Sequence, residues 1–137
     1  MANWYGLTRS NYVGVKDPDK FKEWMSNFAD LQLITKMTKD SKTLYGFHDI
    51  SGEGGIPSYY EDVDGNEVDV DFLAEFAKHL NEDQVLIIMQ AGHEKARYAS
   101  GYSIAVNHKG QTIQLDLDDI YDKARRLFGI TPTLATY

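Results

Sequence analysis

Carboxylates are the largest set of side chains in this sequence that could bind a ligand or take part in acid–base chemistry. Residues 43–77 contain nine Asp and Glu side chains and no Lys or Arg, whereas the rest of the chain contains 12 acids and 14 bases. The segment therefore has a formal charge of −9 and the remainder a charge of +2. Carboxylates without counter-charges repel one another, and this repulsion lowers the stability of the fold. Such a segment is therefore expected only where the negative charge has a function.

A surface that binds a basic protein is the first hypothesis for this segment. Carboxylates spaced along a loop and a helix edge can take the place of phosphates in front of a groove lined by Lys and Arg. Tyrosines in the segment add aromatic side chains of the kind enriched at interface hot spots. An ordinary solvated loop is the alternative. The candidate partner-binding residues are Asp49, Glu53, Tyr59, Tyr60, Glu61, Asp62, Asp64, Glu67, Asp69, Asp71 and Glu75.

A calcium site is a third interpretation, because the stretch DVDGNEVDVD (62–71) superficially resembles a calcium-binding loop. An EF-hand loop needs Gly at its sixth position and Glu at its twelfth. Counted from Asp62, Gly65 is the fourth residue and Leu73 the twelfth. The pattern fails, so we predict no metal site.

Motifs for catalysis or cofactor binding are incomplete. The SGEGG stretch (51–55) lacks the Lys-Ser/Thr of a phosphate loop and carries a carboxylate that repels phosphate. His93 and Glu94 begin like a zinc-protease motif, but Arg97 stands where the second His belongs. The chain has no Cys, which excludes thiolate sites and disulfides. We therefore expect no catalytic residue, no cofactor and no enzymatic activity.

A small-molecule site is the alternative function. Arg9, Asn11 and Arg97 are polar residues that a pocket or a subunit interface could use to bind or sequester a nucleotide signal. The cluster Arg9, Ser10 and Asn11 also suits a turn or a cap.

The composition is that of a single globular domain, residues 1–137, with an acidic insertion at about 49–71. The net charge of −7 and the pI of about 4.9 predict repulsion from nucleic acids and anionic membranes. The N-terminus has no apolar signal segment, and the longest apolar run, 85–89, is too short to span a bilayer. These features favour a cytoplasmic location.

In the first half of the chain, the pattern predicts a strand at 12–16 and a helix that begins at Asp17 and Pro18. A hairpin of two strands follows at 31–37 and 43–49. The next eight residues, SGEGGIPS, contain three glycines and a proline and predict a loop.

After this loop, Asp64 and Gly65 predict a small hairpin or tight turn, and Asp69 or Asp71 would cap a second helix. The near-continuous apolar run at 84–91 predicts a central strand buried on both faces. The HEKAR stretch that follows predicts a polar turn.

The last part of the chain predicts strands at 98–107 and 111–115 and a helix capped by Asp116 and ended by Gly129. The residues expected on the buried face of that helix are Leu117, Ile120, Tyr121, Ala124, Leu127 and Phe128. The predicted fold class is α+β in the order β-α-β-β-α-β-β-β-α. Its first six elements match the ferredoxin-like order, and the C-terminal hairpin and helix would extend the sheet and cover it.

Three stretches carry a resemblance to a known group of proteins. WYGLTRSNYVGVKD (4–17), GIPSYYEDVDGNEV (55–68) and GYSIAVNHKGQ with LDDIY (101–121) resemble small acidic proteins of bacteriophages and mobile elements. Such proteins tend to be encoded near anti-restriction or anti-CRISPR genes. The resemblance implies an inhibitor of a bacterial defence system, whose partner is a host protein with a basic groove. It would act in the bacterial cytoplasm, and a homodimer is plausible because the chain is rich in tyrosine.

Overall fold

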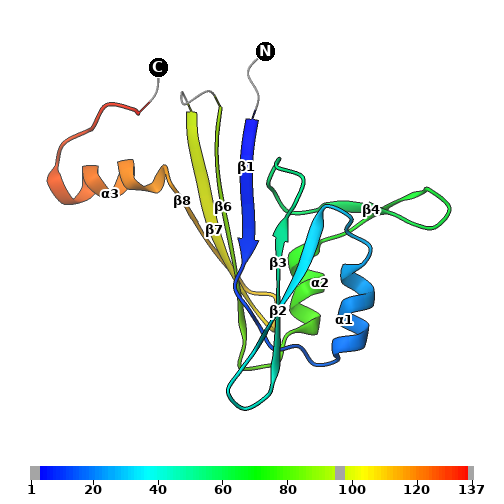
Figure 1. Ribbon diagram of the computed structural model, residues 1–137. Coiled ribbons are helices and arrows are strands. Elements are labelled where there is room, and N and C mark those ends of the chain that lie inside the picture. Colours follow the sequence, from blue (N-terminus) through cyan, green and yellow to red (C-terminus); the bar gives the residue numbers. More distant parts are fainter. Residues whose placement is uncertain (1–3, 95–97, 136–137) are drawn as a thin grey trace.

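The computed structural model describes residues 4–94 and 98–135 and has an α+β fold (Figure 1). Its main sheet has six strands in the order β2-β3-β1-β6-β7-β8, and neighbouring strands are antiparallel. The strands of this sheet are β1 (Trp4–Ser10), β2 (Leu31–Met37), β3 (Thr43–Asp49), β6 (Val85–Glu94), β7 (Tyr98–Asn107) and β8 (Thr112–Asp116). The helices are α1 (Pro18–Met25), α2 (Phe72–His79) and α3 (Asp119–Phe128). In the described part of the chain, no helix is long and apolar enough to cross a membrane.

The acidic segment contributes a separate two-stranded hairpin, β4 (Tyr59–Glu61) and β5 (Glu67–Asp69). These two short strands were predicted as a small hairpin or turn and were not counted in the predicted element order. The order in the structure is therefore β-α-β-β-β-β-α-β-β-β-α.

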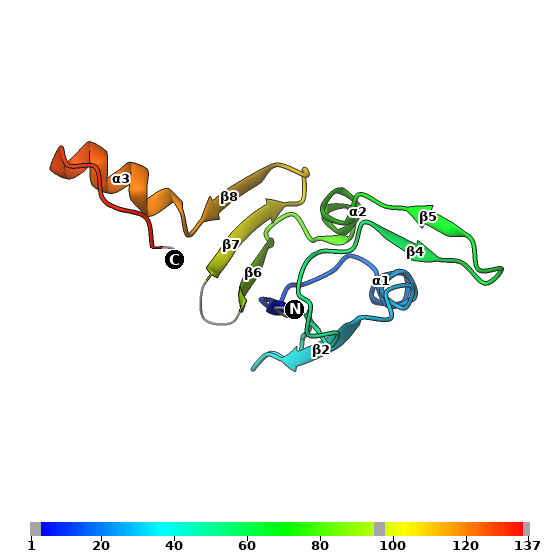
Figure 2. The same cartoon turned by 90° about the horizontal axis from the view of Figure 1, so that it is seen from above.

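Helices α1 and α2 begin as the sequence predicts and lie together against the sheet (Figures 1 and 2). The Asp17 carboxylate accepts a hydrogen bond from the Lys20 N–H (3.2 Å), and Pro18 is the first residue of α1. Asp71 caps α2 in the same way through the Ala74 N–H (3.2 Å). Each cap satisfies a backbone N–H that has no partner within the first helical turn.

Aromatic side chains fill the space between these two helices and the sheet. Phe21 and Phe76 are fully buried and meet edge to face, with ring centroids 5.2 Å apart. Trp24 stacks on Phe72 at 5.2 Å, and Phe47 of β3 meets the same Phe72 ring at 5.5 Å. Aromatic pairs of this geometry contribute roughly 0.5–1.5 kcal/mol beyond their burial. The cluster therefore holds both helices on β3, the strand that precedes the loop and hairpin of the acidic segment.

The first strand is β1, so the predicted strand at 12–16 is wrong. Val13 and Val15 are buried, but they form only isolated bridges. The prediction followed the apolar residues and missed the true strand, where the inward positions are polar.

β1 shows no alternation of apolar and polar residues that would predict a strand, because the side chains that it directs inward are polar. Thr8 and Ser10 are buried, and their hydroxyls accept hydrogen bonds from the Gly55 N–H (2.8 Å) and the Phe47 N–H (2.9 Å). These bonds compensate the two hydroxyls for their removal from water. Their partners lie 47 and 37 residues further along the chain, beyond the reach of any local pattern.

β6 is central in the sheet but is covered on one face only, which corrects the prediction that both faces are buried. Leu86 and Ile88 are fully buried, whereas Met89 is 59% exposed. The strand continues through residues 93–94, where the sequence predicts a turn. Residues 95–97, the rest of that predicted turn, lie outside the described residues.

The last helix begins later than predicted. Asp116 is the final residue of β8, and its N–H donates a hydrogen bond to the carboxylate of Asp119, the first residue of α3 (2.8 Å). Gly129 ends the helix with a φ of 70°, the left-handed conformation expected of a C-terminal glycine.

The apolar face of α3 is exposed, so the prediction that this helix is buried and covers the sheet is wrong. No residue of α3 is buried; Leu127 is 80% exposed and Phe128 74%. The helix projects from the β8 edge, at the opposite end of the molecule from α1 and the β4–β5 hairpin (Figures 1 and 2). A period of 3.6 residues shows that one helix face is apolar, but not that another element lies against it.

Candidate functional site: an acidic hairpin and groove

The β4–β5 hairpin carries five of the nine acids of the acidic segment away from the sheet (Figure 2). Its register pairs Tyr59 with Asp69 and Glu61 with Glu67. Cross-strand partners share a face, and these pairs are two residues apart, so all four side chains lie on one side. All four residues are exposed, and we call them the outer face of the hairpin. Glu61 and Glu67 are directly opposite, and like charges in this arrangement destabilise a hairpin.

The turn of the hairpin is built on Asp62. Its carboxylate accepts hydrogen bonds from the N–H groups of Asp64 and Asn66, both at 2.9 Å. Gly65 has a φ of 81°, a left-handed conformation that favours glycine. Val63 at the tip is fully exposed. Asp62 therefore holds the turn, while the exposed Asp64 adds a further carboxylate beside the outer face.

The two predicted tyrosine contacts have different positions. Tyr60 packs against the core, where its ring meets Phe28 edge to face at 5.7 Å. Tyr59, on the outer face, is 51% exposed. Tyr60 thus anchors the hairpin, and Tyr59 is the aromatic side chain that a partner can reach.

An open groove of about 830 Å³ lies between the hairpin, the 49–58 segment and the 26–31 segment. Phe28 and Tyr60 contribute apolar surface to it. Among the described residues, its lining includes no Lys, Arg or His. Its carboxylates come from Asp30, Asp49, Glu53, Glu61 and Asp62. Such a groove suits a Lys or Arg side chain, whose charged end meets carboxylates while its apolar stem packs on rings.

Asp30 is the residue of this groove that sequence reasoning missed. It precedes β2 and lies outside the acidic segment, in a part of the chain that also contains lysines. The Asp30 carbonyl accepts a hydrogen bond from the Ile50 N–H (2.8 Å), because β2 and β3 form a hairpin that brings residues 30 and 50 together. No local signal in the sequence distinguishes Asp30 from a solvated surface acid.

Asp49 is buried at the end of β3 and organises the groove wall. Its carboxylate accepts hydrogen bonds from the Ser51 hydroxyl (2.8 Å), the Ser51 N–H (3.1 Å) and the Gly54 N–H (2.9 Å). Burial raises the pKa of Asp49, but hydrogen bonds from Ser51, Gly54 and Gly52 outweigh burial, and the pKa lies below its ordinary value. The buried Asp49 carboxylate therefore fixes the conformation of the loop that follows β3. A partner would contact this loop and not the carboxylate itself.

The loop after Asp49 is also fixed to the first strand. The Gly6 N–H donates to the Gly52 carbonyl (2.9 Å), and the Trp4 indole N–H donates to the Glu53 carbonyl (2.9 Å). These bonds hold the backbone of Glu53 at the groove, and the residue itself is exposed.

Gly6→Ala should loosen this loop. An alanine Cβ at position 6 would lie 2.5 Å from the Glu53 carbonyl oxygen, so backbone atoms would have to move. We expect the free energy of unfolding to fall by about 1–3 kcal/mol in chemical denaturation. Ser58→Ala, an exposed change in the same loop, is the control and should shift it by less than about 0.5 kcal/mol. Equal stability of the two variants would contradict the close packing of the loop on β1.

The remaining predicted site residues, Asp71 and Glu75, belong to α2 and not to the hairpin. Asp71 is the helix cap, and Glu75 forms an ion pair with Lys78 at 2.9 Å. Within the described part of the chain, the ion pairs lie inside α2 and α3, and none includes a hairpin carboxylate. Seven of the nine acids of the segment thus lie on the hairpin or in the groove, and the segment itself contains no Lys or Arg.

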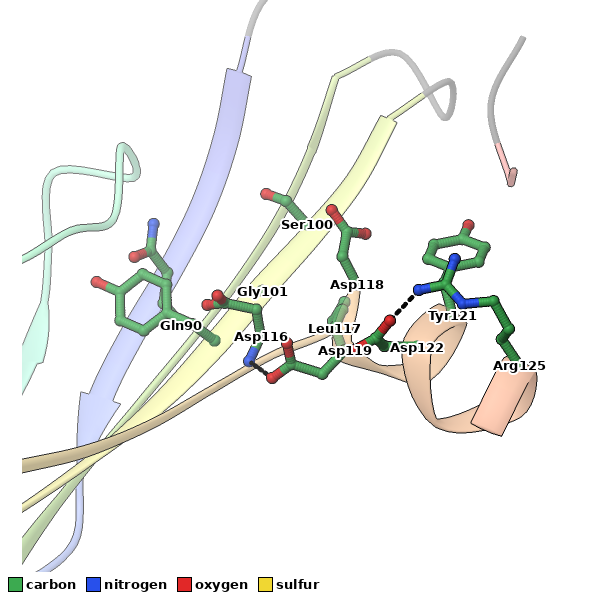
Figure 3. Close-up of a pocket in the computed structure, with 11 residues that line it drawn as sticks. Gln90, Ser100, Gly101, Asp116, Leu117, Asp118, Asp119, Tyr121, Asp122 and Arg125 are labelled. Atoms are coloured by element: carbon green, nitrogen blue, oxygen red, sulfur yellow. Dashed lines mark hydrogen bonds and ion pairs between the residues drawn. The ribbon is translucent and has the colours of Figure 1, made fainter. Parts of the chain in front are cut away.

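A second hollow, of about 550 Å³, lies where α3 leaves the sheet (Figure 3). Its lining is rich in aspartates, but Asp119 accepts the Asp116 N–H and Asp122 pairs with Arg125. Burial raises the pKa of Tyr102, which lines the same hollow from β7. The Asp119 and Asp122 carboxylates already have partners within the chain, so the hollow is a weaker candidate site than the acidic groove.

The two described polar residues of the small-molecule hypothesis, Arg9 and Asn11, line neither of the two hollows. Asn11 is occupied by the backbone of β6, because its side chain donates to the Val85 carbonyl (3.0 Å) and accepts from the Ile87 N–H (2.8 Å). Arg9 is exposed on β1 and lines neither hollow. Arg97 lies outside the described residues.

Neither metal-ligand geometry nor similarity to known proteins assigns a function to these residues. In residues 4–94 and 98–135, no three His, Asp or Glu side chains are grouped so that they could hold a metal ion. Comparison of the chain with protein-family models, with curated proteins and with solved structures finds no match in any of the three.

Proposed function

We propose that the protein is a non-enzymatic inhibitor that binds a basic, nucleic-acid-binding surface of a bacterial defence complex of the CRISPR or restriction type. The observation that carries the proposal is the cluster of carboxylates without ion pairs on the hairpin and in the adjoining groove. A partner that supplies Lys and Arg side chains relieves the repulsion between these carboxylates. The defence target itself rests on the resemblance of the sequence to acidic proteins of bacteriophages.

The hairpin is suited to enter a basic groove. It protrudes from the fold, its tip residue Val63 is fully exposed, and Tyr59 offers an aromatic ring beside Glu61. Negative charge concentrated on a protruding element accelerates encounter with a positive surface and makes association sensitive to salt. The exposed ring and tip then contribute short-range contacts that salt does not screen.

We also propose that β1, α1, β2, β3, α2 and β6 form a ferredoxin-like core. The antiparallel order β2-β3-β1-β6, with β1 between β3 and β6, supports this assignment, as do two helices lying together against the sheet. In such a core the loop after β3 carries the insertion, which is where the acidic segment leaves the sheet.

Competition for DNA tests the proposed function. Purified CRISPR surveillance complexes and type I restriction enzymes are mixed with target DNA and the protein, and bound DNA is measured by gel shift at several salt concentrations. We expect the protein to displace DNA from at least one complex, with less displacement as salt rises. Failure to displace DNA from any of them would refute the proposed target class.

Two variants with the same change of charge locate the surface. Neutralising the hairpin in the variant E61Q/D64N/E67Q/D69N should abolish displacement. Neutralising four exposed acids elsewhere, in E23Q/D40N/E82Q/D83N, should leave displacement nearly unchanged. Equal activity of the two variants would show that net charge, and not the hairpin, is responsible.

A further inference from the structure

Two apolar surfaces of the described chain have no covering element. The first is the face of α3 that carries Leu127 and Phe128. The second is the face of β1, β6, β7 and β8 opposite to the core residues Leu86 and Ile88, which we call the open face. Monomeric proteins rarely expose apolar patches of more than a few hundred Å² unless a partner covers them.

The register of the sheet gathers the open face into one continuous surface. Met89 of β6 is opposite Ser103 of β7, which is opposite Leu115 of β8. Two residues away in each strand, and on the same face, Ile113 of β8 is opposite Ala105 of β7. Ile113 is 71% exposed, and Met89 and Leu115 are exposed as well. An apolar sheet face of this kind is normally covered by a second layer, most often a helix.

The chain's own helix is directed away from this face. The Leu117 N–H still donates to the Gly101 carbonyl of β7 (3.0 Å), and α3 begins two residues later at Asp119. The bond between the Asp116 N–H and the Asp119 carboxylate spans this short link. With this short connection, α3 leaves the β8 edge outward (Figure 2), and the two bonds hold the link in this conformation.

We propose that the protein is a two-fold symmetric homodimer in which α3 of each copy packs on the open face of the other. Each copy has an apolar helix face and an apolar sheet face that its own chain leaves uncovered. Two-fold symmetry places the helix of each copy on the sheet of the other, so one interface covers both kinds of surface. The proposal does not depend on the function assigned to the acidic hairpin.

The area of the two surfaces matches that of a stable dimer. Ten large apolar side chains on α3, on the open face and at Leu117 in the link between them are between 46% and 80% exposed. Fully burying one such side chain removes roughly 60–120 Å² of apolar surface from water, so ten partly exposed ones offer on the order of 600 Å² per copy. Standard interfaces bury about 800 Å² per partner, polar atoms included.

Charge also favours this end of the molecule for contact between two copies. Residues 117–130 contain three acids and three bases, so two such segments do not repel one another. The acidic hairpin lies at the opposite end (Figures 1 and 2), where two copies would repel strongly. A dimer formed through α3 keeps both hairpins apart and accessible.

Sedimentation analysis of the full chain tests the dimer. The wild-type protein should have about twice the monomer mass of 15.6 kDa. The α3 variant L127E/F128E should raise the dimer dissociation constant by about 100-fold or more, because each charge would be buried against an apolar sheet. M89E on the open face should act in the same direction. V63E adds a charge at a fully exposed position of the hairpin tip and should remain dimeric.

Cross-linking identifies which surfaces meet. The chain has no Cys, so Leu127→Cys and Met89→Cys each introduce a single thiol. Mixing the two chains with a short bismaleimide should give a covalent heterodimer, whereas Val63→Cys should not cross-link to Met89→Cys. Far-UV circular dichroism confirms that each variant is folded.

Two results would overturn the proposal. One is a wild-type protein that sediments as a monomer, and the other is a dimer that L127E/F128E and M89E both leave intact. A monomer that also floats with neutral phosphatidylcholine vesicles would assign the exposed face of α3 to a membrane surface instead. Loss of the dimer in the α3 variant without loss of DNA displacement separates this inference from the function of the hairpin.

Discussion

Phe21→Ala should lower the free energy of unfolding by about 3–5 kcal/mol, the range measured for large aromatic side chains removed from protein cores. Phe21 is fully buried and contacts the rings of Phe76 (5.2 Å), Tyr45 (5.6 Å) and His79 (5.6 Å). Its removal leaves a cavity between α1, α2 and β3 that these rigid rings fill poorly. A domain of this size has a total stability of only about 5–15 kcal/mol, so the variant should be close to unfolding at body temperature.

Glu23→Ala is the matched control for this prediction. Glu23 lies on the same helix but is exposed and forms no ion pair within the described residues. Its replacement should change the stability by less than about 0.5 kcal/mol. Urea denaturation followed by Trp fluorescence reports both variants, since Trp24 lies in the same cluster. A loss below about 1 kcal/mol for Phe21→Ala would contradict the packing of α1 and α2 around this ring.

Asp49→Asn should have the second largest effect, a loss of about 2–3 kcal/mol, because hydrogen bonds to a buried charged group are worth more than neutral ones. The carboxylate accepts bonds from the Ser51 hydroxyl and from two backbone N–H groups. An amide in its place presents an NH₂ group to at least one of these donors. The variant should release the 51–55 loop, so limited proteolysis should cut there faster than in the wild-type protein.

The Asp49 carboxyl also makes the wild-type stability depend on pH. Its pKa in the folded protein lies below the ordinary value of 3.8, so folding favours the charged form. This contribution is fully present above the unfolded pKa and is lost as the pH falls through the folded pKa. Between neutral pH and about pH 4 the wild-type protein should keep its advantage over Asp49→Asn, and in stronger acid the two should converge.

Asp40→Asn serves as the control for the pH experiment. Asp40 lies in the exposed turn between β2 and β3 and accepts no side-chain hydrogen bond within the described residues. Its replacement should leave both the stability at neutral pH and the acid transition near those of the wild-type protein. A wild-type protein and an Asp49→Asn variant that differ equally at every pH would contradict the role assigned to the charge.

Several local features of the fold follow from the sequence alone. Asp17 and Pro18 start α1, Asp71 caps α2 and Gly129 ends α3, because capping depends on residues within one helical turn. Strands β2 and β3 occupy the predicted ranges, since a hairpin is specified by its own alternation and turn. The concentration of carboxylates in residues 43–77 is a property of the sequence itself.

Only the tertiary structure decided which of the predicted site residues share a surface and which are covered. Asp49 and Asp62 hold loops, Tyr60 anchors the hairpin, and the distant Asp30 joins the acidic groove. β1 is defined by partners 37 or more residues away, and the apolar face of α3 is exposed although its pattern is that of a buried helix. Periodicity records which side chains point the same way along one element. What lies opposite them depends on contacts between elements, and the apolar face of α3 is exposed in the described chain.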